Sequence, residues 1–282
     1  MKNVKELLMK IVFFLAACVS IFSTILICVF IFANGVPAIK EIGVFKFLFG
    51  TVWKPSNDIY GIFPMIIGSI YVTAGAIILG VPVGVLCAVF MAKFCPEKLY
   101  KIMKPAIGLL AGIPSIVYGF FGLVVVVPII QDIFGTGGKG VLTASIILGI
   151  MILPTIISVS EDAVRSVPES YYEGALALGD THEQAVFRAM VPAAKSGILA
   201  GVILGVGRAI GETMAVIIIA GNQTVIPKSI LSGVRTMTSN IVMEMGYATG
   251  LHREALIATA VVLFIFILII NLSLSLLNRR AE

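Results

Sequence analysis

Six long apolar runs constrain the fold of this chain more than any other feature of its sequence. They cover residues 11–33, 64–92, 105–130, 141–160, 197–220 and 255–277. About 20 mostly apolar residues in a helix cross the hydrocarbon core of a bilayer, where every backbone polar group must be hydrogen-bonded within the protein. The period-two alternation of a membrane β-barrel is absent. We therefore predict an all-α integral membrane protein with six transmembrane helices.

The composition agrees with this class. Hydrophobic residues make up 59% of the chain and charged residues 12%, whereas about 25% of a soluble domain is charged. The apolar runs extend from end to end, which predicts a single transmembrane domain over residues 1–282. The net charge of +5 does not indicate a nucleic-acid partner, because the basic residues lie at the ends of the apolar runs. The lipid bilayer is the partner that the composition predicts.

The first apolar run follows three lysines, as the core of a secretory signal peptide also would. A signal-peptide core is about 7–15 residues long, and the run over residues 11–33 is longer and has no small-residue cleavage site after it. We predict a retained first span. The four cysteines have no metal-ligand spacing and are interpreted as small buried hydrophobic residues.

The basic residues predict the orientation. With the N-terminus inside, 12 of the 20 Lys and Arg residues fall in cytoplasmic segments and 7 fall in outer segments. Cytoplasmic loops of membrane proteins carry an excess of Lys and Arg. Both termini of this multi-pass protein are therefore expected in the cytoplasm.

The longest cytoplasmic loop, residues 161–196, has the pattern of a folded segment. It predicts two short helices, at about 169–178 and 181–190. Gly179 can adopt the left-handed conformation that ends the first, Asp180 or Thr181 can cap the second, and Pro192 closes the unit. Helices this short are not stable alone in water, so they must dock, either on their own bundle or on another protein.

This loop resembles the EAA loop of binding-protein-dependent ABC importer permeases. Residues at the spacing of that motif are Glu173, Gly174, Ala175, Gly179, Ala189, Val191 and Pro192. Gly174, Ala189 and Val191 depart from the strict consensus. The segments "WKPSNDIYGIFPMIIGSIY", "LLAGIPSIVYGFFGL" and "GVGRAIGETMAV" also resemble the PstC family of phosphate permeases, so that the resemblance covers roughly residues 50–277.

The resemblance implies a type I ABC importer permease fold with cytoplasmic coupling helices, in the bacterial cell membrane. It implies a PstA-like permease subunit, a PstB-like ATPase dimer and a PstS-like phosphate-binding protein as partners, with inorganic phosphate as cargo. Glu173, Gly174, Ala175, Gly179 and Pro192 would couple the chain to the ATPase, with Glu173 pairing with a basic residue there. The chain has no Walker sequence of its own, and "GTGGKG" at 135–140 is interpreted as a turn. The chain is therefore expected to be a non-catalytic subunit without a cofactor, and ATP and Mg²⁺ would bind to the ATPase.

Arg208 and Glu212 lie inside the fifth apolar run, near the middle of the bilayer. Charged residues are costly at this depth and usually functional. Their spacing of four predicts that they share one helix face. Three interpretations remain open: a self-satisfied pair that locks helices together, a substrate site, and the proton relay of a secondary transporter. Arg offers a planar fork of donors that matches phosphate oxygens, which favours the substrate site, with Glu212 orienting Arg208.

Hydroxyl groups complete the predicted path. Thr213 lies near the same depth, and Ser115 and Tyr118 lie beside a Gly–Pro interruption in the third run. These hydroxyls can instead bond their own helices. The outer segment with Arg235, Thr236, Thr238 and Ser239 is a candidate anion vestibule.

Two other functions stay open at this point. The chain can be the permease of another oxyanion, such as sulfate or molybdate, because Arg208 would serve any of them. It can also be a secondary transporter that works without an ATPase. A purely structural membrane protein would leave the charges at mid-bilayer without a role.

Overall fold

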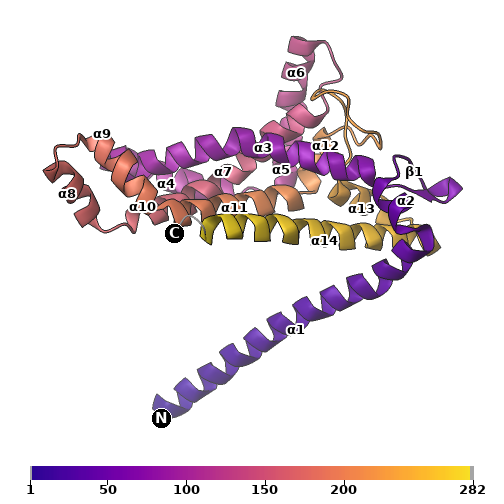
Figure 1. The fold of residues 1–282 in the computed structure, drawn as a ribbon, viewed down its shortest axis with the longest axis horizontal. Helices are drawn as coiled ribbons and strands as arrows, with labels where there is room; N and C mark the ends of the chain where they lie inside the picture. The colour runs from indigo at the N-terminus through magenta and orange to yellow at the C-terminus, as the bar shows by residue number, and fades with distance from the viewer. Residues whose placement is uncertain (1, 280–282) are drawn as a thin grey trace.

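Four long helices run side by side along the long axis of the molecule in the computed structural model, which describes residues 2–279 (Figure 1). They are α3 (Phe63–Val89), α7 (Val141–Arg165), α11 (Lys195–Gly211) and α14 (Gly250–Arg279). The core lies where α7 packs against α3 and α11, and it is built from buried aliphatic side chains such as Ile147, Met151 and Ile152. Glycines allow this close packing: a Cβ on Gly80 would lie 2.8 Å from the carbonyl oxygen of Gly149.

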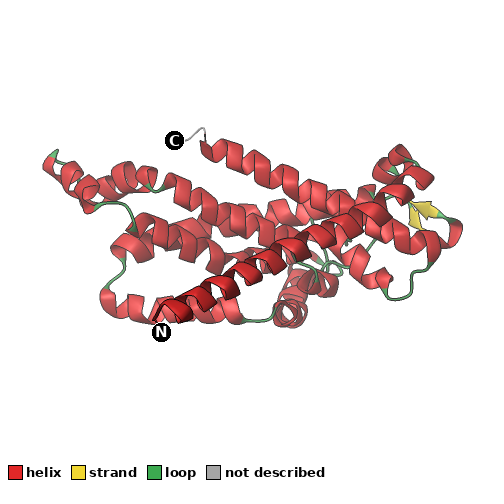
Figure 2. Ribbon diagram, turned by 90° about the horizontal axis from the view of Figure 1, so that it is seen from below, coloured by secondary structure: helices red, strands yellow, loops and turns green. Residues whose placement is uncertain are grey.

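The first helix, α1 (Lys2–Ile42), leaves this bundle at an angle (Figures 1 and 2). Its C-terminal part packs on α14, where the rings of Phe32 and Phe264 meet edge to face at 5.8 Å. The large apolar side chains from Leu7 to Phe30 are exposed. An apolar helix with no protein around it requires lipid or a partner helix.

One end of the bundle carries a short hairpin and two short helices. The hairpin pairs β1 (Trp53–Lys54) with β2 (Ile59–Tyr60) in antiparallel register, with Trp53 opposite Tyr60. The other elements here are the 3₁₀ turn η1 (Pro55–Asn57), α2 (Val44–Phe49) and α13 (Met237–Met245). They share a second core that includes Phe47, Trp53 and Met65.

The opposite end carries the segment that follows α7, which projects beyond the bundle (Figure 1). It consists of α8 (Glu169–Ala177), α9 (His182–Ala185), the π-helical turn η4 (Val186–Met190) and α10 (Val191–Ala193). Gly179 has a φ of 94°, and Thr181 forms a capping box with Gln184. The predicted pair of helical stretches and both of their boundary residues are therefore confirmed.

Two predicted spans are broken in the structure. The run 105–130 begins in α4 (Glu97–Gly112), stops at Ile113 and Pro114, and resumes as α5 (Ser115–Phe121), η3 (Gly122–Val126) and α6 (Val127–Phe134). Proline disfavours the helical conformation of the residue before it, and Ile113 is extended with ψ 125°. The run 197–220 is α11 followed, after Glu212 and Thr213, by α12 (Met214–Ile219).

The structure gives five or six candidate spans. Five described helices are long and apolar enough to cross a membrane. There are six if α11 and the segment His182–Ala193, which meets it at 69°, count as one span. A π-helical turn, η2 (Phe90–Phe94), ends the span that starts with α3.

Candidate functional site

The two helix breaks lie against each other in the middle of the molecule, because α5 packs on α12. Gly119 makes this contact close: a Cβ on it would lie 2.9 Å from the Cα of Ala215. Discontinuous helices of this kind line the substrate sites of many transporters, since their free backbone groups face a cavity rather than lipid. This junction is the candidate site.

Arg208 reaches this junction from the last turn of α11. Its Nη1 atom donates to the Thr155 hydroxyl on α7 at 3.4 Å, a long hydrogen bond. Within residues 2–279, this is the one hydrogen bond of the Arg208 side chain, and no carboxylate lies within 4.0 Å of it. A guanidinium has five N–H donors, so most of its donors have no partner among the described residues. Thr155 was not predicted, because a single Thr in an apolar run gives no signal of its contacts.

Glu212 does not share a helix face with Arg208, and this prediction is wrong. The helix ends at Gly211, and Glu212 is extended, with φ −67° and ψ 132°. Its carboxylate accepts the N–H of Ala215 at 3.3 Å, and its carbonyl accepts the hydroxyl of Thr238 at 3.1 Å. The self-satisfied pair of Arg208 and Glu212 is thus not formed, and Glu212 instead holds the break between α11 and α12.

The three predicted hydroxyls lie at the two breaks. The Tyr118 hydroxyl is buried and donates to the carbonyl of Leu110 at 2.9 Å, so it ties α5 to the end of α4 across the first break. Thr213 donates to the Gly211 carbonyl at 3.2 Å, a local bond at the second break. Ser115 is the first residue of α5 and is half-buried.

Arg235 does not form an open vestibule, contrary to expectation. Its Nη1 pairs with Glu244, and Nη1 also donates to Asn240 at 3.0 Å. Glu244 accepts two further bonds, from Trp53 Nε1 at 2.9 Å and from His252 at 2.8 Å. The neighbouring hydroxyls are also engaged: Thr236 caps α13, Ser239 bonds that cap, and Thr238 bonds Glu212. This cluster fixes the hairpin to α13.

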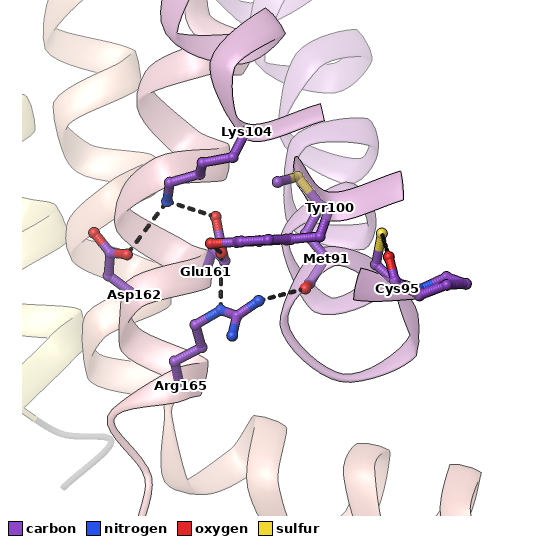
Figure 3. Close-up of polar contacts among 8 residues, drawn as sticks. Met91, Cys95, Tyr100, Lys104, Glu161, Asp162 and Arg165 are labelled. Carbon is purple, nitrogen blue, oxygen red and sulfur yellow. Dashed lines mark hydrogen bonds and ion pairs between the residues drawn. The ribbon is translucent and has the colours of Figure 1, made fainter. Parts of the chain in front are cut away.

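A second buried carboxylate lies near the α8–α9 end (Figure 3). Glu161 is fully buried and accepts hydrogen bonds from Tyr100 at 2.8 Å, Lys104 at 2.7 Å and Arg165 at 2.8 Å. Arg165 Nη2 also donates to the carbonyl of Met91 at 2.8 Å. Burial opposes the charge of Lys104, but its bonds to Glu161 outweigh this and raise the pKa of the Lys104 ammonium. This site was not predicted, because Tyr100 and Lys104 lie 61 and 57 residues from Glu161 in the sequence.

The residues predicted to couple to an ATPase lie on the projecting segment. Glu173, Gly174, Gly179 and Pro192 are exposed, and Ala175 is buried. Glu173 has no ion pair among the described residues. Leu178, beside Gly179, is 90% exposed.

The segment is held in place by its other polar residues. Lys93 of η2 pairs with Glu169 at 2.9 Å, and the Tyr172 hydroxyl contacts His182 Nδ1 at 2.8 Å. The His182 ring also packs edge-on against Phe94. The segment therefore presents an exposed surface from a fixed base.

Comparison with known proteins identifies the family of this chain. Residues 80–282 match the family described as "Binding-protein-dependent transport system inner membrane component". The chain belongs to this family. It is 38% identical over 90% of its length to the probable ABC transporter permease protein YqgH of Bacillus subtilis, of which it covers 86%.

Two further relatives are named as phosphate permeases. The chain is 35% identical to phosphate transport system permease protein PstC of Mesorhizobium japonicum, over 86% of this chain and 81% of that one. It is 34% identical to PstC of Pasteurella multocida, over 84% and 81% respectively. The resemblance to the PstC family is thus confirmed.

Solved structures confirm the fold. The chain superposes on a chain of the MetNI methionine ABC transporter with a TM-score of 0.63 at 18% identity, covering 82% of this chain and 100% of that one. It superposes on a chain of a bacterial alginate ABC transporter with a TM-score of 0.64 at 14% identity, covering 95% and 96%. The chain therefore has the fold of an ABC importer permease and is a membrane protein.

Proposed function

We propose that this chain is the transmembrane permease subunit of an ATP-driven phosphate importer. The relatives named PstC support phosphate as the cargo. The observation on which the proposal rests most is Arg208, a cation at the junction of two broken helices with one long hydrogen bond to the protein. The chain itself is non-catalytic in this proposal, and ATP and Mg²⁺ bind to the ATPase.

In the proposed topology, residues 1–282 form one domain with six spans and both termini in the cytoplasm. The α8–α9 end then faces the cytoplasm, and the hairpin end faces outward. The fold of ABC importer permeases supports this arrangement. It places α8 and α9 as coupling helices and the hairpin of Trp53 and Tyr60 where a phosphate-binding protein would dock.

The proposed path passes the junction of α5 and α12. Arg208 binds phosphate through a planar fork of donors. A site built on one cation is weak enough to release its cargo. Glu212 and Thr213 keep the second break open, while Ser115 and Tyr118 line the first. Thr155 holds Arg208 in the absence of phosphate. Their hydrogen bond breaks easily when phosphate binds, because a hydrogen bond of 3.4 Å is weak.

The proposed partners account for the surfaces that the chain leaves uncovered. A PstA-like permease subunit would complete the path and, with lipid, cover the exposed apolar side of α1. A PstB-like ATPase dimer would receive the projecting segment. Leu178 and Glu173 are the contacts that the exposed surface offers, with Gly179 making the turn between them and α9.

The experiment is ATP-dependent uptake into proteoliposomes that contain this chain with its partner permease, ATPase and phosphate-binding protein. Labelled phosphate is tested against sulfate and molybdate as competitors. Arg208→Gln removes the proposed ligand. Arg253→Gln, at an exposed position near the start of α14, is the matched loss of one positive charge.

We expect phosphate uptake that neither competitor reduces, that Arg208→Gln abolishes and that Arg253→Gln leaves intact. ATPase bound to the Arg208→Gln complex would show that assembly is preserved. Uptake of sulfate or molybdate in place of phosphate would show that this other oxyanion is the cargo. Uptake that needs no ATPase would indicate a secondary transporter, and full uptake by Arg208→Gln would remove Arg208 from the path.

A further inference from the structure

We infer that Glu161, Lys104 and Arg165 are positioning residues that transmit movement of the α8–α9 segment to the broken helix α4–α5. The inference rests on the proposed function as an ATP-driven permease. It concerns a cluster that is separate from the Arg208 site and touches no cargo. The cluster joins two parts of the protein that an ATP-driven cycle would have to move together.

The burial of Glu161 is the first reason. Its side chain is 0% exposed, and two cations and a phenol donate to it (Figure 3). Apolar residues of the same size usually give a buried site equal or greater stability than an ion pair does. Packing alone therefore does not explain why charges occupy this position.

The contacts on one side of the cluster lead to the coupling segment. Arg165 is the last residue of α7, and its guanidinium bonds both Glu161 and the carbonyl of Met91 in η2. The same turn, η2, holds α8 through the 2.9 Å pair of Lys93 and Glu169. A displacement of α8 thus acts on η2 and on Arg165, and both are bonded to the cluster.

The contacts on the other side lead to the candidate site. Lys104 and Tyr100 lie on α4 and bond Glu161 on α7. The C-terminal end of α4 bonds α5 through the Tyr118 hydroxyl and the Leu110 carbonyl. A continuous series of contacts therefore runs from α8 through Glu161 to Tyr118.

The cluster is one of the contacts that attach α4 to the bundle. Most of this helix is exposed, and Ile107 is its one buried residue. Ile107 packs one turn beyond Lys104, in a small apolar cluster with Ala88, Met91 and Ile157. Tyr100 and Met103 of α4 also pack against this apolar cluster, and the polar cluster joins the same helix to Glu161 of α7. The position of α4, and with it the first helix break, thus depends on whether Glu161 keeps its donors.

The test uses Lys104→Met and Glu161→Gln in the complete complex with partner permease, ATPase and binding protein. Lys101→Met is the matched control, because Lys101 lies on the same helix, its one ion pair within residues 2–279 is with Glu97, and both side chains are more than 70% exposed. Lys104→Arg keeps the charge and serves as the conservative variant. Lys104 is 37% exposed, so Lys104→Met tests the inference even if Glu161→Gln fails to assemble.

Two readouts distinguish positioning from stability. The first is uptake per ATP hydrolysed. The second is the labelling rate of a cysteine placed by Ile116→Cys on α5, an exposed position next to Ser115, in a chain whose native cysteines are replaced. This labelling rate, compared with and without ATP and vanadate, does not depend on which anion is the cargo.

We expect Lys104→Met to keep ATP hydrolysis but to lower uptake per ATP at least about fivefold, the lower end of typical coupling between sites. The ATP-dependent change in labelling should be lost with it. Lys101→Met should match the wild type, and Lys104→Arg should retain most of the coupling.

Equal uptake per ATP hydrolysed in Lys104→Met and Lys101→Met would overturn the inference. So would a parallel fall in hydrolysis, uptake and assembled complex, because that result indicates a structural role. If the wild type imports no phosphate but its labelling responds to ATP, the cargo is wrong, and loss of the response in Lys104→Met still supports the inference. If labelling of the wild type does not respond to ATP, the inference and the ATP-driven mechanism both fail.

Discussion

Gly119→Ala tests whether the close crossing of the two broken helices holds the site together. A carbon atom in normal contact lies about 3.5–4.0 Å from its neighbour. The new Cβ would lie 2.9 Å from the backbone Cα of Ala215 and 2.9 Å from the Cδ1 of Ile218. The Ile218 side chain can rotate away, but the backbone cannot. The axes of α5 and α12 must therefore separate by about 0.6 Å or more.

The size of the effect follows from two opposing contributions. Overpacking a tight contact costs about 1–3 kcal/mol. Replacing a helical Gly by Ala returns about 0.5–1 kcal/mol of conformational entropy. We expect Gly119→Ala to lower the free energy of unfolding by roughly 1–2 kcal/mol. This should lower Tm by about 2–8 °C for a chain of this size.

Thermal unfolding of the purified chain in detergent measures this difference. Gly108→Ala is the control, because Gly108 lies on α4 and a Cβ there meets no atom within 4 Å. Gly108→Ala should raise Tm slightly. In the reconstituted importer, Gly119→Ala should also reduce uptake, since Tyr118 moves with α5. A Gly119→Ala chain as stable as the wild type would refute the close crossing.

Three further changes test other parts of the structure. Gly179→Val should detach the ATPase on co-purification, because a β-branched residue disfavours a φ of 94°, whereas Gly108→Ala, on α4, should retain it. Thr181→Ala removes the capping box and should cost about 1 kcal/mol, which hydrogen exchange over residues 182–190 would report; unchanged exchange would contradict the capping role. Glu244→Ala removes the carboxylate that pairs with Arg235 and accepts from the Trp53 indole, and should cost about 3–5 kcal/mol; fluorescence of Trp53, the only Trp, should shift to the red as the hairpin detaches, and an unchanged spectrum would contradict the contact.

Local sequence signals predicted much of the fold. The apolar runs gave the positions of the long helices, because length and hydropathy decide which segments can cross a bilayer. Gly179 and Thr181 marked the turn and the cap of the projecting segment, since both act through their own backbone neighbourhood. Pro114 indicated the first break, because a proline disfavours the helical conformation of the residue before it, here Ile113.

Contacts between distant segments could not be predicted. The second break contains no proline, and an uninterrupted helix over 197–220 was therefore the natural reading of the run. In a continuous helix the Glu212 carbonyl would accept the N–H of Val216. In the structure it accepts the Thr238 hydroxyl, 26 residues away. Glu161 was missed for the same kind of reason, because Tyr100 and Lys104 lie 61 and 57 residues from it.

The charged side chains of the three sites differ in how many hydrogen-bond partners they have. Two carboxylates in the described part of the chain are less than 10% exposed, Glu161 and Glu244, and each accepts hydrogen bonds from three side chains. Such satisfied clusters fix the elements that they join. Arg208 differs, because among the described residues its side chain has one long bond, to Thr155, for five N–H donors. The proposed phosphate site rests on this difference, because a cation between two broken helices that keeps unpaired donors can bind an anion and release it.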